Sequence, residues 1–226
     1  MSRQRPAAGG RRRRAAGDTS SPEGNWIDPE EAGCRLAVKV TAASDLDPLL
    51  AVETVAAIVI EVGDEAVARQ QVAKAHGTGR AALLVDRLDL VAPLGADGVQ
   101  LNRPAEVAAA RQRLDRNELV GAMCGHSRHD AMVAGEDGAD YVVFGIPGVA
   151  PAGGPDGEAG GGPAALVEQV AWWSEVAVLP VMVTGRFTAD DARRLAEAGA
   201  DFIMPTIDGD VPGLEALARA LAAAQR

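Results

Sequence analysis

The segment Gly138-Ala139-Asp140-Tyr141-Val142-Val143-Phe144 decides the fold, because its first three residues occur twice more in the chain. Gly-Ala-Asp returns at residues 95–97 and 199–201, each time directly before a short apolar run. The three aspartates are 43 and 61 residues apart, and the longer interval contains residues 145–162, an 18-residue stretch with eight Gly and three Pro. Without that stretch the interval is again 43, so the chain repeats a unit of constant length.

Each 43-residue interval has room for two strand-plus-helix units of about 21 to 22 residues. The candidate strands are continuous apolar runs, as expected for strands buried on both faces: residues 36–40, 56–62, 81–85, 97–101, 119–122, 140–144, 180–184 and 201–204. Strand and helix alternating eight times predict a single-domain α/β TIM barrel, for which 226 residues is an ordinary length. The recurring Gly follows a helix, where a left-handed residue ends the last turn.

Two of the intervening helices carry recognisable start signals. Residues 104–114 begin with Pro104, which the first turn of a helix tolerates. Residues 188–198 begin with Thr188 as a candidate cap, and Asp190 and Asp191 suit the positive end of the helix dipole.

Residues 1–33 differ from the rest, and we expect them to form a disordered basic extension before a barrel over residues 34–226. Six of the 22 basic residues are arginines in the first fourteen positions, although the whole chain has a net charge of −10. The segment has almost no apolar pattern, so it cannot offset its ordering entropy. It lacks the apolar stretch of a secretory signal. A solvated extension or a misplaced start codon is the favoured interpretation, and a nucleic-acid-binding tail is the alternative.

Composition narrows the classes of function further. No apolar run approaches the roughly 18 residues that cross a bilayer, so we expect no membrane partner. Aromatic residues make up 3% of the chain, which leaves few stacking platforms for nucleic acid. Two cysteines, Cys34 and Cys124, are too few for a disulfide framework. We therefore expect a cytoplasmic protein whose partner is a small molecule.

In a TIM barrel the chemistry lies where strands end and the following loops begin. The residues that this rule selects are Thr41, Glu61, Gly63, Asp86, Arg87, Asn102, Arg103, Cys124, His126, residues 145–162, Thr184, Gly185, Arg186, Pro205, Thr206 and Asp208. Lys39 lies near the end of the first strand, where an inward ammonium would be a Schiff-base candidate. An outward, solvated Lys39 is equally compatible with the sequence.

From about Leu36 onward the chain resembles the thiamine-phosphate synthase family, which includes the TenI-like thiazole tautomerases. The likeness rests on four segments: residues 85–90 (VDRLDL), 95–101 (GADGVQL), 138–145 (GADYVVFG) and the last β-α-β unit, 179–204. The resemblance implies a role in thiamine biosynthesis and a phosphorylated small-molecule ligand. The synthase joins a hydroxymethylpyrimidine pyrophosphate to a thiazole phosphate, and magnesium and basic residues assist the departing pyrophosphate.

The resemblance implies that Asp86 is a magnesium ligand, but the family's other ionic residues are missing. Where the family has a second metal carboxylate, this chain has Asn102-Arg103-Pro104-Ala105. Glu61 and Gly63 stand where the family has Arg and Lys, and residues 147–162 contain neither Thr nor Lys. We therefore expect weak or absent synthase activity, with Arg103 and Lys39 as candidate replacement cations.

The phosphate end of the site is better retained. By resemblance, Thr184, Gly185, Arg186, Thr206 and Ile207 follow the seventh and eighth strands, where many barrels bind phosphate on backbone N–H groups. These loops could equally serve only to end the strands.

His126 follows the fifth strand, and the resemblance to the tautomerases implies proton transfer by this residue if one residue is inserted before it. The alternative is that Ser127 caps the next helix and His126 is a polar loop residue.

Trp172 and Trp173 fit packing on the outside of the barrel, and a contact in a homo-oligomer is their alternative. Two functions thus remain: an enzyme of thiamine biosynthesis, or a non-catalytic barrel that binds a phosphorylated ligand or a partner.

Overall fold

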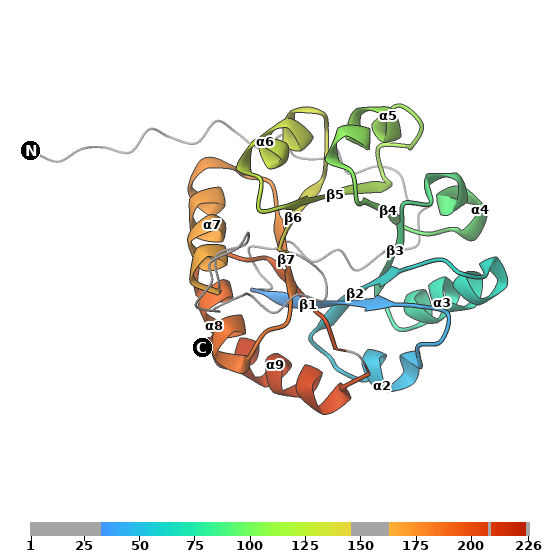
Figure 1. The fold of residues 1–226 in the computed structure, drawn as a ribbon. Helices are drawn as coiled ribbons and strands as arrows, with labels where there is room; N and C mark the ends of the chain where they lie inside the picture. The colour runs from blue at the N-terminus through green and yellow to red at the C-terminus, as the bar shows by residue number, and fades with distance from the viewer. Residues whose placement is uncertain (1–32, 146–162, 208, 225–226) are drawn as a thin grey trace, which may run out of the picture.

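The computed structural model describes residues 33–145, 163–207 and 209–224 and forms a closed eight-stranded parallel barrel. Each strand pairs with its neighbour in the chain, and β1 pairs with β8 to close the ring. Figure 1 shows the strands forming an inner ring with the helices around its outside. The predicted TIM barrel is confirmed.

The strands are β1 (Arg35–Val40), β2 (Val55–Ile60), β3 (Ala81–Val85), β4 (Gly98–Leu101), β5 (Leu119–Gly125), β6 (Tyr141–Gly145), β7 (Val181–Gly185) and β8 (Phe202–Pro205). The helices are α2 (Leu46–Leu50), α3 (Glu65–Gly77), α4 (Val91–Leu94), α5 (Val107–Arg111), α6 (Arg128–Glu136), α7 (Pro163–Val176), α8 (Ala189–Glu197) and α9 (Val211–Ala224), with 3₁₀ turns η1 (Leu88–Leu90) and η2 (Pro104–Glu106). None of the helices in the described ranges is long and apolar enough to cross a membrane. The expected disordered segments, 1–33 and 145–162, lie outside the described residues except for Gly33 and Gly145.

Two predicted elements need correction. Strand β5 continues three residues beyond the expected 119–122, through an irregularity between Met123 and Gly125. The helix expected over 104–114 is a 3₁₀ turn followed by five α-helical residues that end at Arg111. The side chain of Arg111, the last residue of this helix, folds over the next turn and donates to the carbonyl of Glu118 at 2.9 Å. By contrast, α8 begins as predicted, with a capping box between Thr188 and Asp191.

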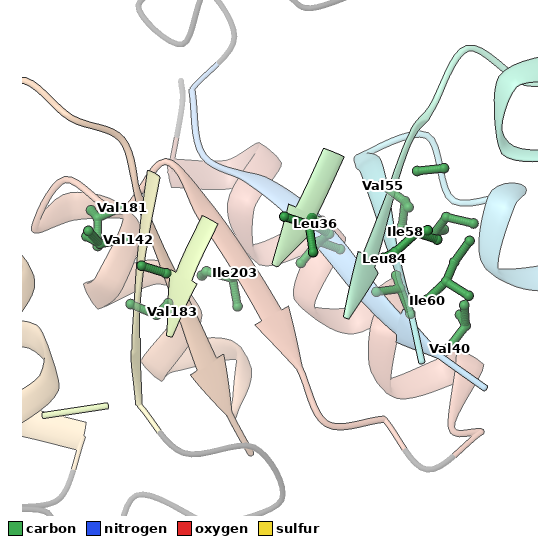
Figure 2. Packing of buried hydrophobic residues seen from close by; sticks show 14 of the residues in the cluster. Leu36, Val40, Val55, Ile58, Ile60, Leu84, Val142, Val181, Val183 and Ile203 are labelled. Atoms are coloured by element: carbon green, nitrogen blue, oxygen red, sulfur yellow. The ribbon is translucent and has the colours of Figure 1, made fainter. Parts of the chain in front are cut away.

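Strand alternation divides the core into two layers. One set of strand side chains faces the helices, and Figure 2 labels several of them, among them Leu36, Ile58 and Ile203. The other set fills the inside of the barrel and consists of Ala37, Ala57, Val59, Leu83, Val85, Tyr141, Val143, Met182 and Met204. The inside is therefore closed by side chains below its carboxyl rim, which confines any ligand to that rim.

The Gly-Ala-Asp repeats make the same turn at the opposite, amino end of the barrel. Their glycines have φ values of 66°, 96° and 103°, which is the left-handed region that favours glycine after a helix. Each aspartate then accepts a backbone N–H from the preceding strand: Asp97 from Ala82 at 2.7 Å, Asp140 from Val120 at 2.8 Å and Asp201 from Val181 at 2.8 Å. The repeat thus ties the starts of β4, β6 and β8 to β3, β5 and β7.

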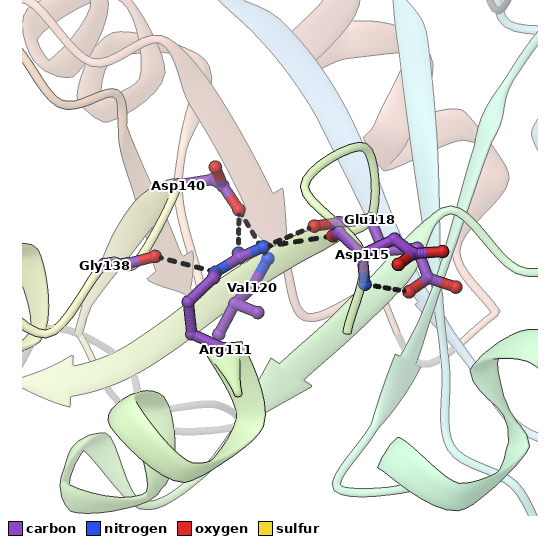
Figure 3. Close-up of polar contacts among 6 residues, drawn as sticks. All are labelled: Arg111, Asp115, Glu118, Val120, Gly138 and Asp140. Atoms are coloured by element: carbon purple, nitrogen blue, oxygen red, sulfur yellow. Dashed lines mark hydrogen bonds and ion pairs between the residues drawn. The ribbon is translucent and has the colours of Figure 1, made fainter. Parts of the chain in front are cut away.

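Arg111 adds a second connection at Asp140. Its guanidinium donates to the Asp140 carboxylate and to the carbonyls of Gly138 and Glu118, so one side chain joins α5, the β5 start and the β6 start, as Figure 3 shows. This side chain is largely buried, with 22% of its surface exposed.

Candidate functional site

The sequence-predicted site residues that the structure describes stand at the carboxyl rim, because the carboxyl ends of parallel strands meet at one edge; Asp208 and residues 146–162 lie outside the described residues. Asp86 follows β3, His126 follows β5, and Thr184 and Gly185 end β7. Arg186 follows β7, and Thr206 and Ile207 follow β8. The rim carries ion-paired side chains above β1–β4, and among the described residues directly after β7 and β8 it carries one charged side chain, Arg186.

Asp86 is the one non-glycine residue in the described part of the chain with a positive φ, 52°. Its N–H donates to the carbonyl of Gln100 at 3.0 Å. Its two carboxylate oxygens accept the backbone N–H of Asn102 at 2.8 Å and the Asn102 side-chain N–H at 2.6 Å. Asp86 therefore joins the loop after β3 to the loop after β4.

This arrangement does not suit a magnesium ion. Magnesium is bound through oxygen ligands, usually one or two carboxylates together with substrate phosphates. Asp86 gives both oxygens to Asn102, while Glu106 pairs with Arg103 and Asp89 pairs with Arg87 at 2.9 Å. No group of three or more metal-ligating side chains occurs within the described ranges. The predicted role of Asp86 as a magnesium ligand has no further support from its surroundings.

Lys39 and Glu61 form an ion pair at the ends of β1 and β2, with Nζ and Oε2 separated by 2.7 Å. Lys39 therefore points along the rim to a carboxylate rather than outward into solvent alone. The other candidate replacement cation, Arg103, pairs with Glu106 and has a side chain that is 77% exposed. Of the two, Lys39 is the one whose strand position directs it into the barrel.

The part of the rim above β7 and β8 is held together by backbone contacts. Thr184 is 3% exposed and lies opposite Met204, and the N–H of Thr206 donates to the carbonyl of Gly185 at 2.7 Å. Gly145, at the end of β6, has a φ of 94°, and a Cβ there would lie 2.0 Å from the Thr184 carbonyl oxygen. Three strands therefore approach one another closely where the phosphate-binding loops were predicted.

The helices that follow these loops already have caps from their own residues. Asp191 accepts the N–H of Thr188 at 3.0 Å at the start of α8. Asp210 accepts the N–H of Gly213 at 3.0 Å at the start of α9. A phosphate at this rim would therefore depend on loop N–H groups and nearby cations more than on these two helix termini.

In the loop after β5 the structure shows the cap expected of Ser127 and does not test the role of His126. Ser127 accepts the N–H of Asp130 at 3.1 Å, so it caps α6 as expected for a structural residue. The irregularity between Met123 and Gly125 accommodates one extra residue, Cys124, two positions before the exposed His126. Burial raises the pKa of Cys124 to about 12, so its thiol stays protonated at neutral pH. Proton transfer by His126 stays a prediction.

A buried polar pair, Tyr141 and Gln100, lies below the rim and is not among the residues predicted from the sequence. Tyr141 donates its hydroxyl proton to Gln100 Oε1 at 3.4 Å, and both side chains are buried inside the barrel. Burial raises the pKa of the Tyr141 phenol above its usual range. The signal was available, because Gln100 is a polar residue at an inward position of an otherwise apolar strand.

The two adjacent tryptophans of α7, Trp172 and Trp173, have different surroundings. Trp173 is buried, packs edge-on against Phe144 with ring centroids 5.7 Å apart, and donates its N–H to the Leu179 carbonyl at 2.8 Å. Trp172 is half-buried beneath the Arg128 guanidinium, which lies 4.6 Å from its ring centroid. Packing of one ring on the outside of the barrel is confirmed.

Comparison with known proteins gives the family. The model for thiamine monophosphate synthase matches residues 61–205. A thiamine-phosphate synthase of Rhodospirillum centenum is 40% identical over 122 residues, which are 54% of this chain and 56% of that protein. One of Erythrobacter litoralis is 38% identical over 135 residues, 59% of this chain and 61% of that protein. One of Chromobacterium violaceum is 36% identical over 160 residues, 68% of this chain and 70% of that protein.

Solved structures agree in fold. A thiamine phosphate pyrophosphorylase from Pyrococcus furiosus superimposes with a TM-score of 0.66 at 21% identity, over 85% of this chain and 97% of that one. A 4-hydroxy-2-oxoglutarate aldolase superimposes with a TM-score of 0.62 at 18% identity, over 88% and 100%. At these identities the likeness concerns the fold alone. The match of the family model to well over half of the chain is decisive, and the chain belongs to the thiamine monophosphate synthase family.

Proposed function

We propose that this barrel binds a thiazole phosphate, or a similar phosphorylated small molecule, at its carboxyl rim as part of thiamine biosynthesis. Its membership of the thiamine monophosphate synthase family supports this ligand class. The matches to the first two relatives span 56% and 61% of those proteins, so their activity is carried to this chain only as part of the proposal. The proposal further holds that synthase turnover is weak or absent.

The observation that carries the second point is the pairing of charges above β1–β4. Lys39 pairs with Glu61, Arg87 with Asp89 and Arg103 with Glu106. A departing pyrophosphate needs preorganised cations, and loss of one such donor typically costs about 10²- to 10³-fold in rate. Cations already paired with carboxylates on this rim stabilise that developing charge poorly.

Synthase activity is tested by mixing the purified chain with hydroxymethylpyrimidine pyrophosphate, thiazole phosphate and saturating magnesium. We expect thiamine phosphate to form far more slowly than the median enzyme turnover of about 10 s⁻¹. Calorimetric titration with thiazole phosphate should nevertheless detect binding, with an affinity that does not change when magnesium is chelated. Turnover near that median would contradict the proposal.

A second candidate function, thiazole tautomerisation, is favoured by the loop after β5. The extra residue Cys124 precedes an exposed His126 at the rim, and imidazole is suited to moving a proton near neutral pH. Tautomerisation of a thiazole phosphate should then be lost in His126→Ala and retained in His129→Ala, a matched change of an exposed histidine on α6. Ligand binding without tautomerisation in the unaltered chain would favour the non-catalytic alternative.

A further inference from the structure

Lys39 and Glu61 are directed into the barrel by strand alternation. On β1, Ala37 belongs to the inner core layer while Val38 and Val40 face the helices, so Lys39 falls on the inner side. On β2, Ala57 and Val59 are inner residues, and Glu61 continues that series. A cation and an anion therefore stand at the top of an otherwise apolar wall.

The register of β1 and β8 brings Lys39 to the phosphate-binding part of the rim. Arg35 pairs with Phe202 and Leu36 with Ile203. Extending that register by three residues brings Lys39 level with Thr206, whose N–H is bonded to Gly185 on β7. By this extended register Lys39 stands beside the loops after β7 and β8 while it pairs with Glu61.

The ion pair is hard to explain as a stabilising feature. Lys39 and Glu61 side chains are 36% and 56% exposed, and exposed ion pairs contribute little to stability. A lysine ammonium has three N–H donors, and Glu61 is the partner among the described residues that takes one of them. The remaining donors are available to an anion at the rim.

We propose that Lys39 is a phosphate-binding residue, and that Glu61 is its partner in the absence of ligand and competes with the ligand for it. The inference rests on the proposed function and narrows it to a small phosphate monoester whose phosphate lies between β8 and β1. A single paired cation suits one phosphate group better than a pyrophosphate with its greater charge. Lys39 then adds a second cation beside the loops after β7 and β8, of which the first contains Arg186.

The experiment measures the dissociation constants of thiazole phosphate and of inorganic phosphate by calorimetry for four proteins. Removing a hydrogen bond to a charged group costs affinity, and Lys39→Met should weaken thiazole phosphate binding about 10-fold or more. Glu61→Gln removes the competing charge and should tighten binding several-fold. Lys74→Met is the matched control, because Lys74 pairs with Asp47 at the same 2.7 Å distance and is 41% exposed, and it should leave binding unchanged.

The outcomes separate this inference from the function on which it rests. If the unaltered chain binds neither compound, the proposed function is wrong and the inference with it. If the unaltered chain binds thiazole phosphate and Lys39→Met binds equally well, the inference alone is wrong. Should Lys39→Met fail to fold, the near-isosteric Glu61→Gln still decides, because unchanged or weaker binding in that variant contradicts competition by Glu61.

Discussion

The two ends of the barrel differ in how regular their loop contacts are. At the amino end, Asp97, Asp140 and Asp201 each accept a backbone N–H from the preceding strand, at distances that agree within 0.1 Å. At the carboxyl rim the described loops share no such contact: the loop after β3 is joined to the loop after β4 through Asp86 and Asn102, and the loop after β5 ends in the Ser127 cap. The internal repeat therefore encodes the scaffold, and the residues that break the repeat are where ligand chemistry can differ among barrels of one fold.

The three equivalent aspartates at the amino end differ from one another in the second group that each one contacts. Asp140 pairs with Arg111, and Asp97 pairs with His76 at 2.9 Å. No side-chain cation within the described ranges pairs with Asp201, and burial raises its pKa. The same backbone contact is thus supported to three different degrees, which predicts three different responses to substitution.

The largest effect is expected at Arg111. Arg111→Ala removes donors to Asp140 and to the Gly138 and Glu118 carbonyls, leaving a half-buried carboxylate without its cation. Breaking a buried pair by removing one partner costs about 3–5 kcal/mol, and partial exposure here places the expected loss near 3 kcal/mol. Urea unfolding of Arg111→Ala and of the unaltered chain measures this loss in the free energy of unfolding. Arg193→Ala, which removes exposed pairs on α8, should cost less than about 1 kcal/mol; equal losses would refute the special role of Arg111.

A smaller loss of folding stability is expected from a substitution at Gly145, where β6 meets β7 at the rim. Gly145→Ala forces a side chain into a backbone with φ of 94° and a Cβ 2.0 Å from the Thr184 carbonyl oxygen. Strained backbone of this kind costs about 1–3 kcal/mol. Gly125→Ala also has a positive φ, 57°, but no atom lies within 4 Å of its Cβ. Thermal unfolding should therefore occur at a lower temperature in Gly145→Ala than in Gly125→Ala, and an equal or higher melting temperature for Gly145→Ala would contradict the close contact at Gly145.

At Asp201 the expected change has the opposite sign. Burial raises the pKa of Asp201, because the folded state disfavours the charged carboxylate. The contribution of Asp201 to the free energy of unfolding therefore falls as the pH rises through the pKa that Asp201 has in the folded state. Asp201→Asn keeps an oxygen for the Val181 N–H and removes the charge, so the variant should gain stability relative to the unaltered chain at pH 7. That gain should shrink below about pH 4, the unperturbed aspartate pKa. Asp140→Asn loses its pair with Arg111 and should be less stable at pH 7; a gain in both variants would remove the distinction between the repeats.

The strands were predictable because each is a continuous apolar run followed by a turn residue. The extension of β5 was not, because Met123-Cys124-Gly125 carries no signal that separates a bulged strand from a loop. The contact of Arg111 with the Glu118 carbonyl, seven residues later, spans the turn after α5, and helix propensity does not encode such a contact. At the site, the positions on the rim followed from the fold. The link between Asp86 and Asn102 did not, because it joins two loops through one residue with a positive φ.

The smallest effect is expected at His76, the partner of Asp97. The His76 and Asp97 side chains are 41% and 38% exposed, and a pair this open to water contributes about 0.2–1 kcal/mol. His76→Ala should therefore cost less than about 1 kcal/mol in urea unfolding at pH 7. Asp97→Ala should cost more, because it also removes the acceptor of the Ala82 N–H at 2.7 Å. If His76→Ala proves as damaging as Asp97→Ala, the second partner rather than the shared backbone contact supports this turn, and the three repeats are less alike than their sequence implies.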